Sequence, residues 1–246
     1  DYHPRLPEFL RWCEQVDRVA RLHNPLPILR WNTDKHYLAD LEAAGIPVVP
    51  TRFVEPDAEP LPALQAFLDT FPEAAEFVVK PTVSAGSRDT QRYRRDQEFA
   101  AANHIGRLLD AGRSAMLQPY LDAVDTCGET ALLYFNGQFS HALRKAALLR
   151  PNEAPTDHTQ LADAIAARAP EVDELQLAET ILAALQTRGD GAPLYARIDL
   201  IRDSDGRPRL LELELTEPSL FLTSVPAAAE RFATAITLTL AQRSRS

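Results

Sequence analysis

Cysteine is scarce in this 246-residue chain, in which only Cys13 and Cys127 occur, far apart in the sequence. Two distant cysteines form neither a disulfide framework nor a zinc-binding pattern, and they are typical of a protein in a reducing cytoplasm. No apolar run approaches the roughly 18 residues of a membrane span, and no signal peptide is visible. The chain begins without an initiator methionine, which weakens the argument from the missing signal. We predict a cytoplasmic protein without a membrane partner.

Basic residues are also in the minority, with 26 Lys and Arg against 35 Asp and Glu and a net charge of -9. This balance argues against nucleic acid as the main partner, and an anionic substrate would need local cations. The motifs of several enzyme classes are missing as well. The six histidines form no HExxH spacing, and the absence of a GxSxG motif argues against covalent nucleophilic catalysis.

The remaining composition, 45% hydrophobic and 25% charged, is that of a globular protein with a sizeable core, built as one domain or as two lobes. Segments with helical spacing of apolar residues alternate with short apolar strands and hairpins. We predict helices at 6–22, 35–44, 61–71, 95–109, 172–185 and 227–241, strands at 46–51, 76–81 and 114–121, hairpins at 129–145 and 194–215, and a mobile loop at 149–160. This alternation predicts an α+β fold rather than a regular parallel sheet.

The stretch RLLELELTEPSL, at 209–220, places Glu212 and Glu214 two residues apart in an apolar run. Successive side chains of a strand point to opposite faces, so the glutamates share one face and Leu211, Leu213 and Leu215 share the other. On a solvated face the repulsion between the two carboxylates is weak, whereas in a cleft it is stronger and favours a bound cation.

The turn DSDG, at 203–206, pairs this stretch with the preceding strand, LYARIDLIR. Alternation can then put Arg197 and Asp199 on the same face as Glu212 and Glu214. Three converging carboxylates offer the hard oxygen ligands that Mg²⁺ prefers. A solvated hairpin face with an Arg–Glu surface pair fits the same spacing, so the spacing alone leaves both interpretations open.

Lys80 ends the apolar strand FVVK, directly before the loop VSAGSRDT. An ammonium group beside backbone donors from Ser84, Gly86 and Ser87 is a reasonable phosphate site. The loop lacks the GxxxxGK[ST] pattern of a P-loop, and a lysine that merely closes a strand is the alternative. Lys35 stands at a helix start, where cations are unfavourable, and this indicates an anionic partner, although a single exposed lysine is usually just solvated.

Five stretches, taken in order, resemble the ATP-grasp superfamily of carboxylate–amine ligases: NTDKHYLADLEAAGIPVVPT, FVVKPTVSAGSRD, LQPYLDAVD, YARIDL and LLELEL. The resemblance covers about residues 30–225, and the steps of 13 residues from Asp199 to Glu212 and of 2 residues to Glu214 are those of the D-alanine ligase branch. It implies an ATP-grasp fold of two α+β lobes that grip ATP. The implied domains are the end of an N-terminal pre-ATP-grasp domain at 1–32, a central lobe at 33–120 and a C-terminal lobe at 121–246.

The resemblance also implies which residues bind ATP. Two lysines and the small-residue loop would hold the phosphates, and the hinge between the lobes would hold the adenine and the ribose. The implied nucleotide ligands are Lys35, Lys80, Ser84, Gly86, Ser87, Gln118, Tyr120, Leu121 and Asp125. Tyr120 and Leu121 would act through their backbone, and Glu129 is the alternative to Asp125 for the ribose hydroxyls.

Two Mg²⁺ ions are implied at the second hairpin. Asp199, Glu212 and Glu214 would be their ligands. Arg197 and Lys145 would be the catalytic residues, which stabilise the transferred phosphate and the tetrahedral intermediate. D-alanine ligases have asparagine where this chain has Glu214, and they have a Pro-Gly turn in place of TEPSL, so the resemblance argues against a D-alanine ligase.

Three segments, KPTVSAGSRDT, SHALRK and LELTEPSL, resemble those of the ATP-grasp branch that includes the O-ureido-D-serine cyclo-ligase of cycloserine biosynthesis. The resemblance implies an ATP-dependent ligase that activates a substrate carboxylate as an acyl phosphate, forms a C–N bond with an amine and releases ADP and phosphate. In that branch the amine would belong to the same molecule. The implied partners are ATP and a small amino-acid-like substrate, with a homo-oligomer left open. A small-molecule kinase on the same fold and a non-catalytic nucleotide-binding protein are the alternatives.

Overall fold

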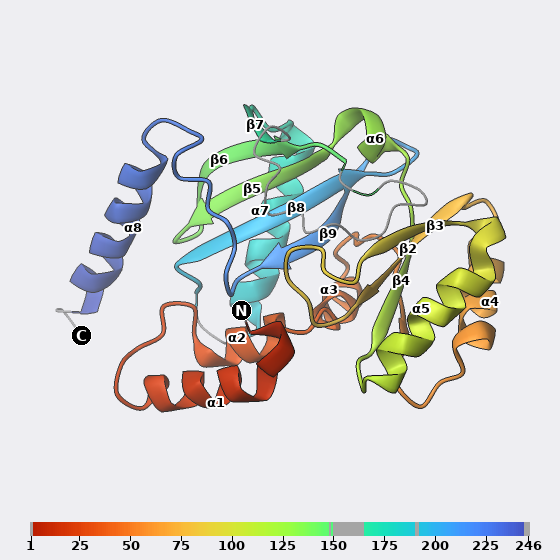
Figure 1. Cartoon of the computed structure of the whole chain (residues 1–246). Coiled ribbons are helices and arrows are strands. Elements are labelled where there is room, and N and C mark those ends of the chain that lie inside the picture. The colour runs from red at the N-terminus through yellow and green to blue at the C-terminus, as the bar shows by residue number, and fades with distance from the viewer. Residues whose placement is uncertain (1, 148, 150–164, 190–191, 244–246) are drawn as a thin grey trace.

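The computed structural model describes residues 2–147, 149, 165–189 and 192–243, which form two antiparallel sheets with helices packed around them (Figure 1). The predicted α+β class is confirmed. The loop predicted at 149–160 lies, except for Leu149, outside the described residues. None of the helices in these ranges combines the length and the apolar character that crossing a membrane requires.

The smaller sheet has the strand order β1-β4-β2-β3, and helices α4 and α5 pack on it. Its elements are β1 (Arg52–Val54), α4 (Pro60–Thr70), β2 (Glu76–Pro81), β3 (Gln91–Arg94), the short helix η2 (Arg95–Gln97), α5 (Glu98–Asp110) and β4 (Ala115–Pro119). Phe67, Phe77 and Ile105 are fully buried between sheet and helices. Burial of such side chains contributes about 1.5 to 3 kcal/mol each. Strand β2, which ends next to the cavity described below, is therefore firmly held.

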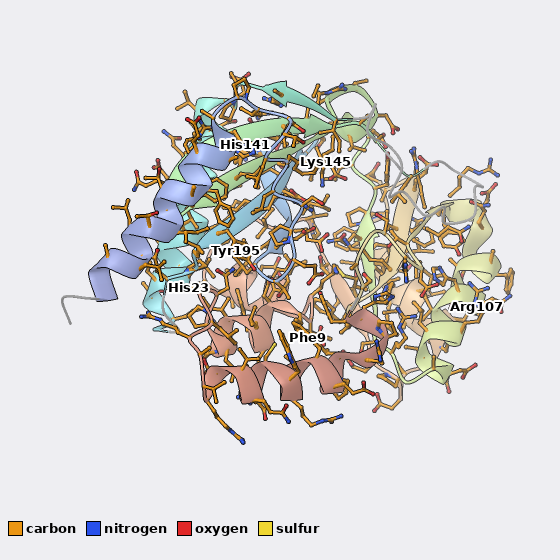
Figure 2. All side chains as sticks on the ribbon, turned by 60° about the vertical axis from the view of Figure 1, so that its left-hand side comes forward. Phe9, His23, Arg107, His141, Lys145 and Tyr195 are labelled. Carbon is orange, nitrogen blue, oxygen red and sulfur yellow. The ribbon has the colours of Figure 1, made fainter. Side chains whose placement is uncertain are left out.

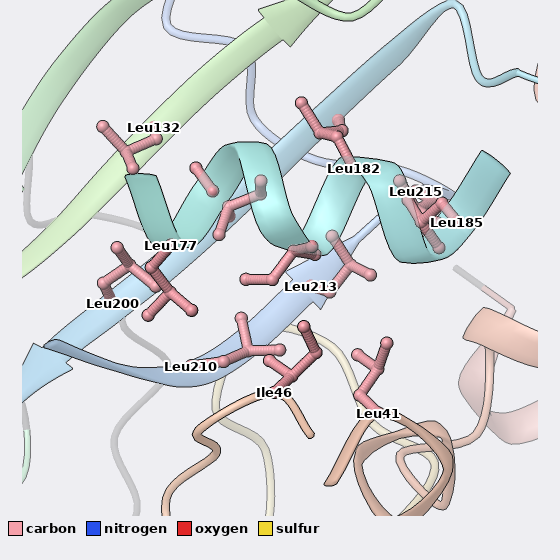
Figure 3. Packing of buried hydrophobic residues seen from close by; sticks show 14 of the residues in the cluster. Leu41, Ile46, Leu132, Leu177, Leu182, Leu185, Leu200, Leu210, Leu213 and Leu215 are labelled. Carbon is pink, nitrogen blue, oxygen red and sulfur yellow. The ribbon is translucent and has the colours of Figure 1, made fainter. Parts of the chain in front are cut away.

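The larger sheet has the strand order β7-β6-β5-β8-β9, and α7 packs across one of its faces. Its elements are β5 (Glu129–Phe135), β6 (Gln138–Lys145), β7 (Ile165–Arg168), α7 (Val172–Thr187), β8 (Tyr195–Arg202) and β9 (Pro208–Glu214). Figure 3 shows Leu177, Leu182 and Leu185 of α7 in one buried cluster with Leu132 and Leu213 of the strands. This core supports the sheet from behind and leaves its other face for the site.

The remaining helices lie around the two sheets (Figure 1). They are η1 (His3–Arg5), α1 (Leu6–Asp17), α2 (Leu26–Asn32), α3 (Tyr37–Ala43), α6 (Ala123–Cys127) and α8 (Ala228–Arg243). Tyr37, Leu41 and Val48 belong to the same buried cluster as α7. By packing, therefore, the smaller lobe begins near Arg52, whereas the predicted central lobe begins at residue 33.

Strand β9 forms one edge of the larger sheet, and the N-terminal segment completes its hydrogen bonds. The Leu213 N–H donates to the Tyr37 hydroxyl at 2.9 Å. The Asn32 side-chain amide donates to the Leu213 carbonyl at 2.8 Å and accepts from the Leu215 N–H at 2.7 Å. Because an edge with unpaired backbone groups is prone to mispairing, Asn32 and Tyr37 hold in place the strand that carries both glutamates.

The predicted elements differ from the structure in identifiable places. Both hairpins and the helices after residue 60 are confirmed. The strand predicted at 46–51 is wrong, because only Val48 makes an isolated bridge, to Leu210, and β1 begins at Arg52. The helix predicted at 6–22 already ends at Asp17, and Val19 beyond it is exposed. Elements α2, α6, β3 and β7 were not predicted, since each is too short to show a hydrophobic period.

Replacing Asn32 with alanine should loosen β9. The Leu213 carbonyl and the Leu215 N–H would be left unpaired, so we expect the free energy of unfolding to fall by about 2 to 4 kcal/mol. Urea denaturation followed by circular dichroism measures this change. Asn103→Ala, at an exposed position of α5, is the control and should change it by less than about 0.5 kcal/mol. Equal effects of the two substitutions would contradict the role of Asn32 at this edge.

Candidate active site

A cavity of about 620 Å³ lies between the two lobes and is lined from both. Every predicted site residue except Asp125 lines it. The smaller lobe contributes the end of β2, the loop after it and the end of β4, and the larger lobe contributes β5, β6, β8 and β9. Figure 2 shows Lys145 on the side of the larger sheet nearer the smaller lobe, with His141 further along the same strand. The structure thus brings together residues that are far apart in the sequence.

The pairing of β8 with β9 places Arg197 opposite Glu214 and Asp199 opposite Glu212. All four residues line the cavity, so the prediction that they share one face is confirmed.

The predicted position of Leu211 on the opposite face is wrong. The register of β8 and β9 shifts beyond Asp199, because Leu200 pairs with Leu210 and leaves Leu211 as an extra residue. Such a bulge turns a side chain away from its regular alternation. Leu211 therefore lines the cavity in an apolar cluster with Val49 and Ile201, while Leu213 and Leu215 stay in the core.

Asp199 is the most buried of the three candidate metal ligands, and two cations hold it. Arg197 Nε donates to Asp199 Oδ1 at 3.0 Å, and Lys145 Nζ donates to Oδ2 at 2.7 Å. Lys145 Nζ also lies 2.7 Å from Glu129 Oε2, and Arg197 also contacts Glu214. Burial favours the neutral acid, but the two cations outweigh it and lower the pKa of Asp199. Asp199 is therefore ionised at neutral pH.

The two glutamates differ in charge compensation. Burial acts against ionisation of Glu212, but Lys35, whose Nζ lies 3.1 Å from Glu212 Oε1, and Lys80 lower its pKa. Glu214 pairs with Arg197. Burial nevertheless raises the pKa of Glu214 to about 7, helped by the charge of Glu212. Glu214 is thus the least compensated of the three candidate metal ligands.

The donor set fits Mg²⁺ that arrives together with a phosphate. Magnesium usually takes one or two carboxylates and completes its octahedron with water and phosphate oxygens. Within the described ranges, no group of three or more His, Cys, Asp and Glu side chains is arranged to hold a metal by itself. The carboxylates are paired with lysine and arginine instead. The site therefore offers carboxylates for a shared ion rather than a closed protein cage.

Lys80 is the last residue but one of β2, lines the cavity and is 8% exposed. Burial lowers its pKa, and no carboxylate of the described residues lies within ion-pairing distance of its Nζ. In the loop that follows, Gly86 and Ser87 have φ of +63° and +56°, a left-handed conformation found in loops that bind anions through backbone N–H groups. Lys35 Nζ donates to the Ser84 carbonyl at 3.1 Å. Two lysines and a donor loop thus meet here.

The hinge segment, at 118–121, also lines the cavity. Gln118 is buried, and its Nε2 donates to Thr51 Oγ1 at 2.8 Å. The Tyr120 N–H donates to the Glu76 carbonyl at 2.9 Å, so the backbone group of Tyr120 that is left to meet the adenine is its carbonyl. The Leu121 N–H has no acceptor among the described residues. Leu121 therefore remains the backbone donor of the predicted pair.

Asp125 does not line the cavity. Its carboxylate accepts from Arg92 at 3.2 Å and from the Tyr120 hydroxyl at 2.6 Å. The Arg92 guanidinium also stacks 3.5 Å from the centre of the Tyr120 ring. Glu129, the predicted alternative, does line the cavity. Asp125 lies within the five-residue helix α6, whereas Glu129 begins β5, so the two acidic residues belong to different elements.

Lysine usage is a signal that the sequence analysis missed. The chain contains three lysines, Lys35, Lys80 and Lys145, and all three line the cavity. The other basic residues, 26 less these 3, are arginines. Lysine is a compact point charge that suits phosphate oxygens, whereas arginine prefers planar, bidentate partners. Asn32 was also missed, because its partners on β9 are distant in the sequence.

A two-lobed α+β fold, with a phosphate-type loop on one sheet and paired carboxylates on the other, defines the class: the chain belongs to the ATP-grasp ligase family. It is 47% identical over 234 residues to the cycloserine biosynthesis protein DcsG of Streptomyces lavendulae, a match that covers 94% of this chain and 78% of the relative. The crystal structure of the D-cycloserine synthetase DcsG superposes with a TM-score of 0.91 and 45% identity, over 97% of this chain and 80% of that chain.

More distant structures share the fold alone. The D-alanine–D-alanine ligase of Bacillus anthracis in complex with ATP is 14% identical, with a TM-score of 0.57 over 87% of this chain and 66% of that chain. The ATP-grasp ligase PsnB, complexed with a minimal precursor, Mg and ADP, is 20% identical, with a TM-score of 0.54 over 84% of this chain and 58% of that chain. No family model matches the chain.

Gly128 lets Lys145 reach its partners, and alanine should disturb this arrangement. Gly128 has φ +73° and ψ -174°, a conformation nearly restricted to glycine, and a Cβ there would lie 2.5 Å from the Lys145 carbonyl oxygen. Gly45→Ala is the control, because Gly45 has φ +85° and no atom within 4 Å of such a Cβ. We expect Gly128→Ala to lower the free energy of unfolding by at least about 1 kcal/mol more than Gly45→Ala in urea titrations. Similar losses would show that this contact is unimportant.

Proposed function

We propose that this protein is an ATP-dependent cyclo-ligase that closes the ring of cycloserine or of a close analogue. The observation that carries the proposal is the cavity in which Lys80 and the loop after it, on the smaller lobe, face the paired carboxylates of the larger lobe. The 47% identity to DcsG supports the ring-forming reaction. ATP and Mg²⁺ are the implied cosubstrate and metal, as in the complexes of the two distant relatives.

The nucleotide would lie along the cavity from the hinge to β9. The Leu121 N–H and the Gln118 amide would meet the adenine, inside the apolar wall that contains Leu211. Glu129, rather than Asp125, would accept from the ribose hydroxyls, because Glu129 lines the cavity and Asp125 does not.

Lys80 would contact the phosphates first, because it has no carboxylate partner among the described residues. Lys35 would join it by leaving Glu212. Loop donors at Ser84, Gly86 and Ser87 would complete the phosphate site. Positive charge held in place before the reaction lowers the barrier because it needs no rearrangement as charge develops.

Asp199, Glu212 and Glu214 would hold the metal. Bound Mg²⁺ would neutralise charge on the transferring phosphoryl group. Two ions per ATP would add no net charge to the cavity, because the charges of ATP and of two Mg²⁺ cancel. The lining itself carries a slight excess of carboxylates: its cations are Lys35, Lys80, Lys145 and Arg197, and its carboxylates are Glu129, Asp199, Glu212, Glu214 and Glu217.

The reaction would proceed in two displacements. A carboxylate oxygen of the substrate attacks the γ-phosphorus, and ADP leaves. A nitrogen of the same molecule then attacks the acyl phosphate carbon, and phosphate leaves with the bridging oxygen. In a D-serine derivative with nitrogen on its side-chain oxygen, this attack closes a five-membered ring. Arg197 and Lys145 would stabilise the negative charge of the phosphate and of the tetrahedral intermediate.

Glu212→Gln tests the metal assignment, because it removes one ligand charge and keeps the shape. With O-ureido-D-serine, ATP and Mg²⁺, we expect ADP release to fall at least about a hundredfold, while the circular dichroism spectrum is unchanged. Asp205→Asn, at the exposed tip of the same hairpin, should keep normal activity. Mass spectrometry of the wild-type reaction should show the cyclised product or D-cycloserine. A phosphorylated end product would identify a kinase, and normal activity of Glu212→Gln would remove this residue from the site.

The scarcity of lysine allows a second test. Burial lowers the pKa of Lys80, whereas the charges of Asp199 and Glu129 raise the pKa of Lys145. An amine-reactive reagent at pH 8 should therefore modify Lys80 faster than Lys145. Saturating ADP with Mg²⁺ should slow the modification of Lys80 at least about fivefold, as measured by peptide mass spectrometry. Adenosine with Mg²⁺, which has no phosphate, is the control and should protect little. Equal rates with and without ADP would place Lys80 outside the phosphate site.

A further inference from the structure

Glu217 differs from the other carboxylates that line the cavity. Glu129, Asp199, Glu212 and Glu214 each pair with a lysine or an arginine. Glu217 lines the same cavity, but no Lys, Arg or His side chain of the described residues lies within ion-pairing distance of it. An anion without a countercharge inside a cavity favours a ligand that brings a cation.

The loop that carries Glu217 is held in place next to Arg197. The Tyr195 hydroxyl donates to the Thr216 carbonyl at 2.8 Å, and His141 Nε2 lies 3.0 Å from the Leu220 carbonyl oxygen. Arg197 itself reaches the Ser219 carbonyl at 3.5 Å. The loop is thus attached to β6 and β8 by three side chains, and Glu217 is presented from a fixed backbone.

Two further groups make this end of the cavity polar. Tyr2 lines the same cavity, and the charge of Glu217 adds to the burial that raises the pKa of the Tyr2 hydroxyl. The Thr216 hydroxyl is buried without a hydrogen-bond partner among the described residues, although the residue lines the cavity. Glu217 keeps part of its surface exposed to solvent, yet partial burial raises the pKa of its carboxyl to about 7. A cation in contact with Glu217 would relieve this cost.

We propose that Glu217 binds the α-ammonium group of an amino-acid substrate and that the loop at 215–221 selects amino acids over acids that lack the amine. The inference rests on the proposed function, which puts the substrate carboxylate beside Arg197. In an α-amino acid the ammonium is bonded to the carbon next to that carboxylate. It therefore lies within a few ångströms of the carboxylate. Glu217, three residues after Glu214 and without a cationic side chain of its own, is the acceptor that the cavity offers there.

The test compares two substrates that differ only in the ammonium group: O-ureido-D-serine and 3-(ureidooxy)propionate. The wild-type protein, loaded with ADP and Mg²⁺, should bind the amino acid at least about tenfold more tightly, as expected for a charge-assisted hydrogen bond. In Glu217→Gln this preference should fall to about twofold or less, through weaker binding of the amino acid alone. Glu217→Asp should restore part of the preference. Isothermal titration calorimetry gives all the affinities without turnover.

Glu179→Gln, on the exposed side of α7, is the matched control and should keep the full preference. The affinity of each variant for ADP with Mg²⁺ should stay within about twofold of wild type, which also shows that the fold is intact. A preference that is unchanged in Glu217→Gln would overturn the inference and leave the proposed function standing. If the wild-type protein binds neither ADP with Mg²⁺ nor O-ureido-D-serine, the proposed function itself fails.

Discussion

The bridge that Arg197 makes between Asp199 and Glu214 is the interaction on which the site depends. Arg197 is almost completely buried, and its carboxylate neighbours keep it charged despite the cost of burial. Removing one partner of such a buried pair typically costs about 3 to 5 kcal/mol, because the other charge is left uncompensated. The register in which β8 pairs with β9 therefore cannot shift by even one residue. Asn32 and Tyr37 help to keep this register, because they hydrogen-bond to the outer edge of β9.

The ion pairs of the cavity also explain how the protein can keep so many charges in one place without a ligand. Lys35 and Lys145 hold Glu212 and Asp199, and these are the groups that metal and phosphate would take over. Binding then exchanges partners rather than burying new unpaired charge, which keeps the desolvation cost low. Lys80 and Glu217 lack such partners among the described residues, and a phosphate and a substrate cation would bind beside them.

The sequence predicts local features of this protein better than distant ones. The turns Asn136–Gly137 and DSDG define both hairpins and, through strand alternation, the shared face of Asp199 and Glu212. A bulge reverses that alternation at Leu211, and no residue type in the sequence announces it. The contact of Asn32 with Leu213 spans 181 residues, so it arises only when the lobes have folded. The choice between Asp125 and Glu129 likewise depends on Arg92, which comes from a strand that was not predicted.

Transfer of a carboxylate oxygen is the central claim, because it separates acyl phosphate chemistry from every other use of ATP. O-ureido-D-serine labelled with ¹⁸O in its carboxylate should be incubated with the protein, ATP and Mg²⁺, and the released phosphate analysed by mass spectrometry. The account predicts one ¹⁸O atom in each phosphate released, formed in step with the ring product. Unlabelled phosphate accompanying ring formation would contradict it, since the carboxylate oxygen would then never have been bonded to phosphorus.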